Sequence, residues 1–194
     1  MLEAMSAPPL TLALFTGSLR PDGVSAAAAH SVKSVLPGHL QAVDVAFGGF
    51  PLYDPRLHLG PLGSPDGADL PEPVRSAYRV VRDAAGVIIV TPEYNYGIPG
   101  PLKNALDWLS RPGFKSVFAG KRVAVLSVSP SVTGGVRAQG ALKTVLGGMV
   151  AQVFPFPEVC LAGALAARGD DGGLADAGSR ERVAGLVQAF VASL

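Results

Sequence analysis

Cysteine, charge and basic runs are all scarce in this sequence. The single cysteine among 194 residues, Cys160, excludes an internal disulfide, and no second Cys or His stands near it at metal-ligand spacing. Charged residues make up 16% of the chain, against about 25% in typical globular domains. The 16 basic and 15 acidic residues leave a net charge of +1 without a long basic run. Nucleic acid is therefore not expected as a partner, and no metal site is expected.

Long hydrophobic runs are absent as well. The chain has no stretch of about 18 apolar residues, the length that a membrane-crossing helix needs. Residues 1–20 carry Glu3 and lack a basic start, so a secretory signal is not expected there. We expect a cytoplasmic protein that does not contact membranes, folded as one domain over residues 1–194.

The sequence does contain a regular alternation of apolar and helix-compatible segments. Strands are expected at 10–16, 40–46, 86–90, 122–128 and 158–162, and helices at 25–36, 73–84, 99–110, 135–149 and 179–193. Residues 47–69, rich in Pro and Gly, show no regular pattern. This alternation predicts the α/β class, as a flavodoxin-like, doubly wound parallel sheet of five strands in the order 2-1-3-4-5 with helices on both faces. Such sheets bind ligands beyond the carboxyl ends of their strands.

The segment after the first strand has the features of a phosphate site. Ser18, Arg20 and Ser25 lie where the chain enters a helix, and a helix start offers unpaired N–H groups to an anion. The segment matches neither the Walker A loop nor the G-x-G-x-x-G dinucleotide loop. An ordinary turn with Ser25 as helix cap remains an alternative.

The segment after the third strand concentrates aromatic and polar groups. Glu93, Tyr94, Asn95 and Tyr96 are consecutive, and such a loop could bracket a flat ring with polar edges, for example an isoalloxazine. The alternative is that the tyrosines are core or interface residues around a simple turn.

Two segments together carry a longer pattern. They are Gly17-Ser18-Leu19-Arg20 with Ser25, and Pro92-Glu93-Tyr94-Asn95-Tyr96-Gly97-Ile98-Pro99-Gly100-Pro101-Leu102-Lys103-Asn104-Ala105-Leu106-Asp107-Trp108. This pattern resembles the NADPH-dependent FMN reductase family, and the likeness runs from about residue 10 to about residue 159. The resemblance implies a flavodoxin-like homodimer or homotetramer that binds FMN without a covalent link. It also implies electron transfer from NADPH or NADH to a flavin, quinone, azo dye or chromate.

The resemblance also assigns residues to the cofactor. It implies that Ser18, Arg20 and Ser25 hold the FMN phosphate. The ribityl chain and ring would lie along the segment that contains Pro92, Glu93, Tyr94, Asn95, Tyr96 and Gly97. Residues 127–138 are similar to the family's glycine-rich flavin loop, where Ser129 and Gly134 are the best candidates. The chain departs from the family at Ala27, where an Asn is usual, and at Ser131 and Val132, where glycines are frequent.

No catalytic acid or base is expected, because the flavin supplies the redox chemistry. A non-catalytic, flavodoxin-like electron carrier is the main alternative, although such carriers are usually strongly acidic. A serine hydrolase built on Ser18 lacks a late histidine, since none follows His58. The three histidines, His30, His39 and His58, are interpreted as structural or exposed. Trp108 is expected in the core or at a subunit interface, and Arg137 as a surface cation or a nicotinamide-phosphate ligand.

Overall fold

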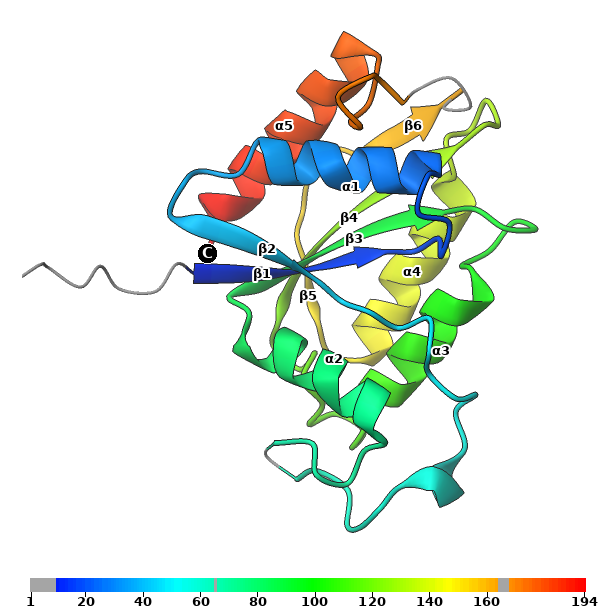
Figure 1. Cartoon of the computed structure of the whole chain (residues 1–194), viewed down its shortest axis with the longest axis vertical. Helices are drawn as coiled ribbons and strands as arrows, with labels where there is room; N and C mark the ends of the chain where they lie inside the picture. The colour runs from blue at the N-terminus through cyan, green and yellow to red at the C-terminus, as the bar shows by residue number, and fades with distance from the viewer. Residues whose placement is uncertain (1–9, 65, 164–167) are drawn as a thin grey trace, which may run out of the picture.

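The structure, a computed structural model, describes residues 10–64, 66–163 and 168–194. Residues 1–9, which belong to the segment where no secretory signal is expected, lie outside the described residues. Two layers of helices enclose one parallel sheet (Figure 1). Among the described residues, no helix has the length and apolar character to span a bilayer.

All strand pairs in the sheet are parallel. The strands are β1 (Leu10–Thr16), β2 (Leu40–Asp44), β3 (Gly86–Pro92), β4 (Arg122–Ser129), β5 (Gln152–Val153) and β6 (Cys160–Ala162). Their order is β2-β1-β3-β4-β5, and β6 also pairs with β4. The expected order 2-1-3-4-5 is confirmed.

The fifth strand position differs from the expectation, because two short strands occupy it in place of one. The Phe154 N–H donates to the Val123 carbonyl at 2.8 Å, and the ladder resumes only where the Ser127 N–H donates to the Val159 carbonyl at 3.0 Å. Pro155 and Pro157 stand between these points and have no N–H to donate. The prolines therefore divide the edge of the sheet into β5 and β6.

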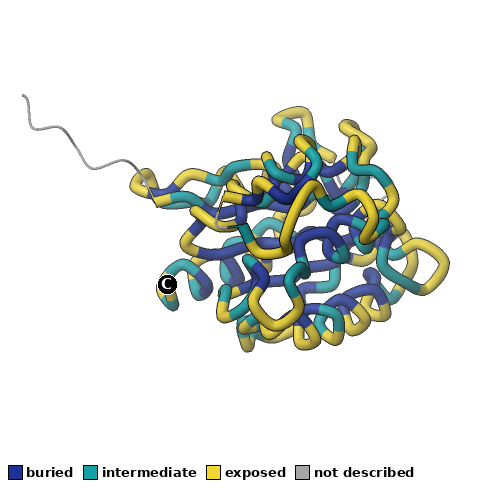
Figure 2. Tube along the Cα trace, turned by 90° about the horizontal axis from the view of Figure 1, so that it is seen from below, coloured by how far each residue is buried: buried dark blue, intermediate teal, exposed yellow. Residues whose placement is uncertain are grey.

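The helices cover both faces, as expected. Helices α1 (Val24–Ser34) and α5 (Ala177–Val191) lie on one face, and α2 (Glu72–Asp83), α3 (Gly100–Leu109) and α4 (Val136–Gly148) on the other (Figure 1). Alternate side chains of β1 serve the two layers: Leu12 and Leu14 pack with α1 and α5, while Ala13 and Phe15 pack with α2, α3 and α4. Every residue of β3 is buried, so this strand forms the centre of the sheet. Figure 2 shows this buried centre with the exposed residues on the outer turns.

The irregular segment after β2 is fastened to α3. Its only regular element among the described residues is the short helix η1 (Pro55–Leu57). The Asn104 side chain accepts from the Tyr53 N–H at 2.8 Å and donates to the Pro51 carbonyl at 2.9 Å, and Trp108 Nε1 donates to the same carbonyl at 2.8 Å. Trp108 is fully buried within the chain, so of its two expected places the core is correct.

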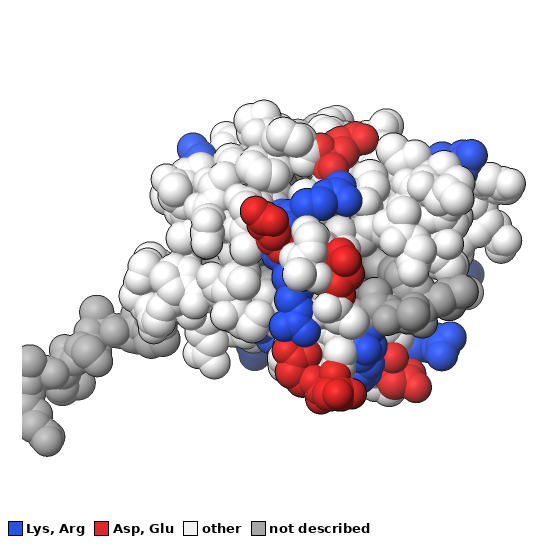
Figure 3. Space-filling model, turned by 90° about the horizontal axis from the view of Figure 1, so that it is seen from above, with Lys and Arg blue, Asp and Glu red and all other residues white. Residues whose placement is uncertain are grey.

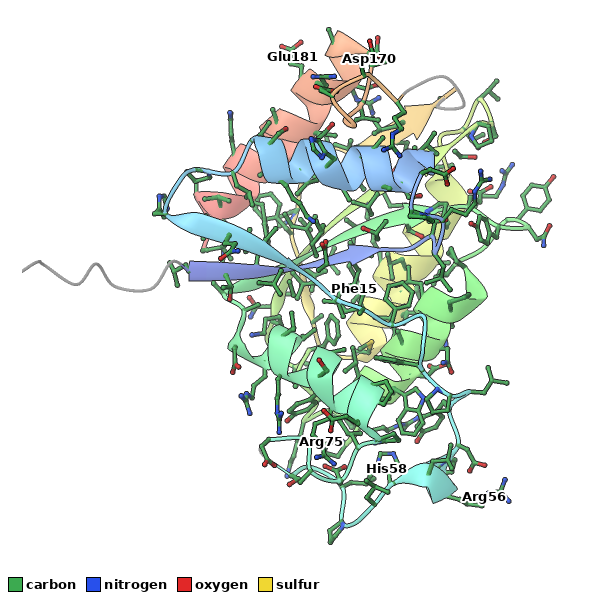
Figure 4. The ribbon with its side chains drawn as sticks, viewed as in Figure 1. Phe15, Arg56, His58, Arg75, Asp170 and Glu181 are labelled. Atoms are coloured by element: carbon green, nitrogen blue, oxygen red, sulfur yellow. The ribbon has the colours of Figure 1, made fainter. Side chains whose placement is uncertain are left out.

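The histidines are structural or exposed, as expected. His58 lies in the long segment after β2, close to η1 (Figure 4). Its Nδ1 is 3.4 Å from the Asp69 carboxylate, and its ring centroid is 5.3 Å from that of Trp108. His30 and His39 are exposed.

Candidate functional site

The loop after β1 lies directly against the end of β3. The Gly17 N–H donates to the Val90 carbonyl at 2.8 Å. A Cβ at Gly17 would lie 2.9 Å from that carbonyl oxygen and 3.0 Å from Pro92 Cδ. Only glycine allows this approach, so Gly17 and the buried Pro92 bring two of the predicted segments together.

The start of α1 presents free N–H groups. The N–H groups of Ala26 and Ala27 bond to the Gly23 carbonyl, whereas those of Val24 and Ser25, the first two helical residues, have no intrahelical partner. The N-cap is Gly23, so the alternative in which Ser25 caps the helix is wrong. Ser25 is 1% exposed inside the first turn. This helix end is suited to an anion.

Ser18 and Arg20 lie on the same loop. The Ser18 hydroxyl accepts from the Arg20 N–H at 3.2 Å and lies 3.1 Å from the Tyr94 hydroxyl. The Arg20 guanidinium is 4.0 Å from the Asp22 carboxylate, and both side chains are about three-quarters exposed. The Ser18 contact thus joins the loop after β1 to the loop after β3.

The loop after β3 forms a tight hairpin. Tyr94 and Gly97 exchange backbone hydrogen bonds of 3.1 and 3.0 Å around Asn95 and Tyr96. Both central residues have positive φ, 49° at Asn95 and 65° at Tyr96, as a type I′ turn requires. This strained turn projects the Tyr96 ring outward, where it is 72% exposed. Backbone strain of this kind clusters at binding sites.

Glu93 connects this hairpin to α4. Its carboxylate accepts from the N–H groups of Arg137 and Ala138 at 3.1 and 3.3 Å, and from the Arg137 guanidinium at 3.3 Å. The guanidinium also lies 4.6 Å from the centre of the Tyr96 ring, a cation–π contact. Glu93 therefore supplies the cap that Gly135, the N-cap residue of α4, cannot provide.

The loop after β4 completes the site. The Ser129, Ser131 and Thr133 hydroxyls form a chain with distances of 3.1 and 2.9 Å. Gly134 and Gly135 have φ of 59° and 84°. A Cβ at Gly134 would lie 2.8 Å from the Cys160 backbone, so glycine is needed there to let the loop pass β6.

Two cavities adjoin these loops. The first, which we call the ring cleft, has a volume of about 430 Å³ and is lined by Glu93, Asn95, Tyr96, Ser129, Ser131, Val132, Thr133 and Arg137. The second, which we call the α1 groove, measures about 600 Å³ and includes Ser18 and Arg20 in its lining. Of the other predicted site residues, Ser25, Pro92, Tyr94, Gly97 and Gly134 line neither of these cavities.

The predicted segments lie together, but not every predicted residue has a side chain that is free to contact a cofactor. Glu93, expected along the cofactor, has its carboxylate occupied by α4. Two features were not predicted from the sequence. Arg137 contacts Glu93 and Tyr96, and Ser131 and Thr133 line the ring cleft. One signal was available for Arg137, because a cation directly after Gly134-Gly135-Val136 stands at a helix start, where the helix dipole disfavours it unless an acid pairs with it.

Comparison with known proteins agrees with this geometry. The family model described as NADPH-dependent FMN reductase matches residues 10–166. The chain belongs to this family. FMN and NAD(P)H are accordingly its cofactor and co-substrate, and the flavodoxin-like fold is confirmed.

Named relatives and a solved structure extend the match. This family member is 40% identical over 136 residues to 2-hydroxy-1,4-benzoquinone reductase from a Burkholderia species, covering 70% of this chain and 69% of that protein. It is 33% identical over 184 residues to a quinone reductase from Escherichia coli K12, covering 93% of each. The flavoenzyme NAD(P)H:(acceptor) oxidoreductase FerB from Paracoccus denitrificans shares the fold with a TM-score of 0.81 and 31% identity, covering 94% of this chain and 96% of that one.

Proposed function

We propose that this FMN-dependent NAD(P)H oxidoreductase passes its electrons to a quinone, and that residues 1–194 work as one FMN-binding domain. The observation that carries the proposal is the junction of three loops. Ser18 contacts Tyr94, and Glu93 contacts the start of α4, so an anion site and a cleft for a flat ring adjoin. Two relatives named quinone reductase support the choice of acceptor over flavins, azo dyes and chromate.

The residues present fit FMN. The free N–H groups of Val24 and Ser25, with Ser18 and Arg20, suit its phosphate. The ring cleft, with its backbone turns and hydroxyl groups, suits the isoalloxazine. When bound, FMN supplies the hydride transfer, so the protein needs no acid or base of its own.

The chain's own groups bind and orient. Asn95 and Tyr96 of the hairpin and residues of the 129–133 loop line the walls of the cleft, and the Glu93 carboxylate ties the hairpin to the start of α4. Preorganised N–H and hydroxyl donors on these walls would stabilise negative charge on a reduced ring without rearrangement. A ring held there with one face left open would admit the co-substrate and the acceptor.

A visible absorption spectrum tests this function. We expect the purified protein to be yellow, or to become yellow with added FMN, and NADPH to bleach the flavin bands in the absence of an acceptor. Absence of FMN binding would overturn the proposal. Bleaching by an external reductant but not by NADPH or NADH would favour the electron carrier, a function that the near-neutral net charge of +1 does not support.

We further propose that the chain works as a cytoplasmic homo-oligomer, a dimer or a tetramer. Four leucines of the segment after β2 support an interface, with exposed fractions of 83% at Leu52, 67% at Leu59, 51% at Leu62 and 41% at Leu57. Trp108 does not serve this purpose, since it is buried within the chain. Light scattering at micromolar concentration should give a multiple of 19.8 kDa, and a fully active monomer would contradict the proposal.

A further inference from the structure

The α1 groove, the larger of the two cavities, includes Ser18 and Arg20 of the proposed FMN phosphate site and extends beyond them along α1 to Lys33 and Arg168. It opens beside the carboxyl ends of β1 and β2, along one flank of α1. Its floor is apolar: Leu14 comes from β1, Val45 follows β2, and Ala26 and Ala29 come from α1.

The rim of the groove is basic. Arg20 comes from the loop after β1, His30 and Lys33 from α1, and Arg168 from the segment before α5. Among the described residues of the lining, Asp44 supplies the only carboxylate, which lies 2.6 Å from Lys33. Arg168 has no ion-pair partner among the described residues. Seen from above in Figure 3, acidic and basic side chains alternate in a band over the α1 and α5 face, and much of the rest is uncharged.

This combination suits an adenosine phosphate. An apolar floor accepts a flat base, basic groups on the rim accept phosphate, and a carboxylate at the end of the second strand can accept from ribose hydroxyls. The volume of about 600 Å³ falls within the range of about 300–1,000 Å³ that small-molecule sites occupy. The FMN phosphate, proposed to lie at Ser18 and Arg20, takes up one end of this space, and the part along Lys33, Asp44 and Arg168 remains for a second ligand.

The groove is also placed to share a ligand with the ring cleft. Ser18 lines the groove, and its hydroxyl lies 3.1 Å from that of Tyr94. Tyr94 begins the hairpin whose next two residues, Asn95 and Tyr96, line the ring cleft. A molecule with two linked halves could therefore place one half in each cavity.

We propose that the α1 groove binds the adenosine phosphate half of the nicotinamide co-substrate while its nicotinamide lies at the ring cleft. This inference rests on the proposed function and adds to it the subsite that recognises the co-substrate. Lys33 and Arg168 bind the phosphate groups, and the Asp44 carboxylate accepts from the ribose.

The test is a calorimetric titration of the FMN-loaded protein with 2′,5′-ADP, 5′-ADP and inorganic phosphate. We compare Lys33→Gln and Arg168→Gln with Lys143→Gln. The Lys143 control is closely matched, because Lys143 pairs with Glu158 at 2.7 Å, as Lys33 pairs with Asp44 at 2.6 Å, and it lines neither cavity. We expect both groove variants to bind at least one of the two adenosine phosphates, 2′,5′-ADP or 5′-ADP, about ten-fold or more weakly than wild type. Lys143→Gln should leave the affinity for the adenosine phosphates unchanged. All three variants should bind FMN as tightly as wild type.

Kinetics provide a second readout. The KM for NADPH or NADH should rise in the groove variants at unchanged kcat, whereas reduced nicotinamide mononucleotide, which lacks adenosine, should serve wild type and variants equally. Three results would overturn the inference: no binding of either adenosine phosphate, equal affinity for inorganic phosphate, or unchanged affinity in both groove variants. Failure of the proposed function is recognised separately, by the absence of flavin absorbance before any titration begins.

Discussion

Arg20 has an exposed side chain beside the free N–H groups at the start of α1. Its contact with Asp22, at 4.0 Å in solvent, is worth little, so the guanidinium can turn toward a bound anion. We expect Arg20→Ala to weaken FMN binding about 10- to 150-fold, since charge-assisted hydrogen bonds are lost. Riboflavin, which has no phosphate, should bind almost as before. Fluorescence titration measures both, and equal losses would show that Arg20 does not hold the phosphate.

Gly17 is the residue at which two loops come closest. A Cβ there would lie 2.9 Å from the Val90 carbonyl oxygen and 3.1 Å from a Leu102 methyl group. We expect Gly17→Ala to lower the free energy of unfolding by about 1–3 kcal/mol through overpacking. The affinity for FMN should fall as well. Gly49→Ala is the control, because a Cβ at Gly49 meets no atom within 4 Å. Equal denaturation midpoints for the two variants would mean that the close approach is not important.

At the scale of elements, Glu93 determines how α4 begins. Its side chain is 7% exposed and caps two N–H groups of the helix. We expect Glu93→Ala to cost about 0.5–2 kcal/mol of stability, as the loss of a helix cap does, and to speed FMN release because the cleft walls separate. Glu93→Gln, which keeps one acceptor oxygen, should recover part of both effects.

The control for this prediction is Glu158→Ala. Glu158 pairs with Lys143 at the surface and lines neither cavity, so its loss should change stability little. Denaturant unfolding and stopped-flow FMN release measure the two effects. Unchanged FMN release in Glu93→Ala would show that the capped helix start does not position the cleft.

Helix α5 has a carboxylate cap of its own. Hydrogen bonds from the Ser179 hydroxyl and N–H lower the pKa of Asp176 below its ordinary 3.8. A lowered folded-state pKa means that the cap contributes stability above the unfolded pKa and loses it as pH falls through the folded value. Wild type should therefore melt at a higher temperature than Asp176→Ala near pH 6, and the difference should shrink below about pH 4. A difference that persists unchanged in acid would contradict this role.

At the scale of the whole molecule, the site has one ring cleft on one edge of the sheet. If the nicotinamide and the acceptor use the same exposed ring face, they cannot occupy it together. NADPH should then reduce the flavin and leave before a quinone enters, which gives parallel double-reciprocal lines when both are varied. Intersecting lines would indicate a ternary complex and separate places for the two substrates.

Much of the architecture and the location of the site could be predicted from the sequence. The buried β3, the five main helices and the order of the sheet follow from apolar runs and periodicity, which act over a few neighbouring residues. The helix expected at 73–84 is Glu72–Asp83, and that expected at 99–110 is Gly100–Leu109. The two motif segments also indicated the correct end of the sheet, because the carboxyl ends of parallel strands lie at the same end.

Only the tertiary structure decided which side chains meet. Glu93 and Arg137 are 44 residues apart, and no local pattern states that the carboxylate of one caps the helix of the other. The division of the fifth strand depends on where Pro155 and Pro157 fall opposite β4, a matter of register between distant segments. The α1 groove likewise brings Ala29 of α1 and Val45, which follows β2, into one lining. Local propensity determines elements, whereas a site is made by packing between elements, and that is specified only when the whole chain is folded.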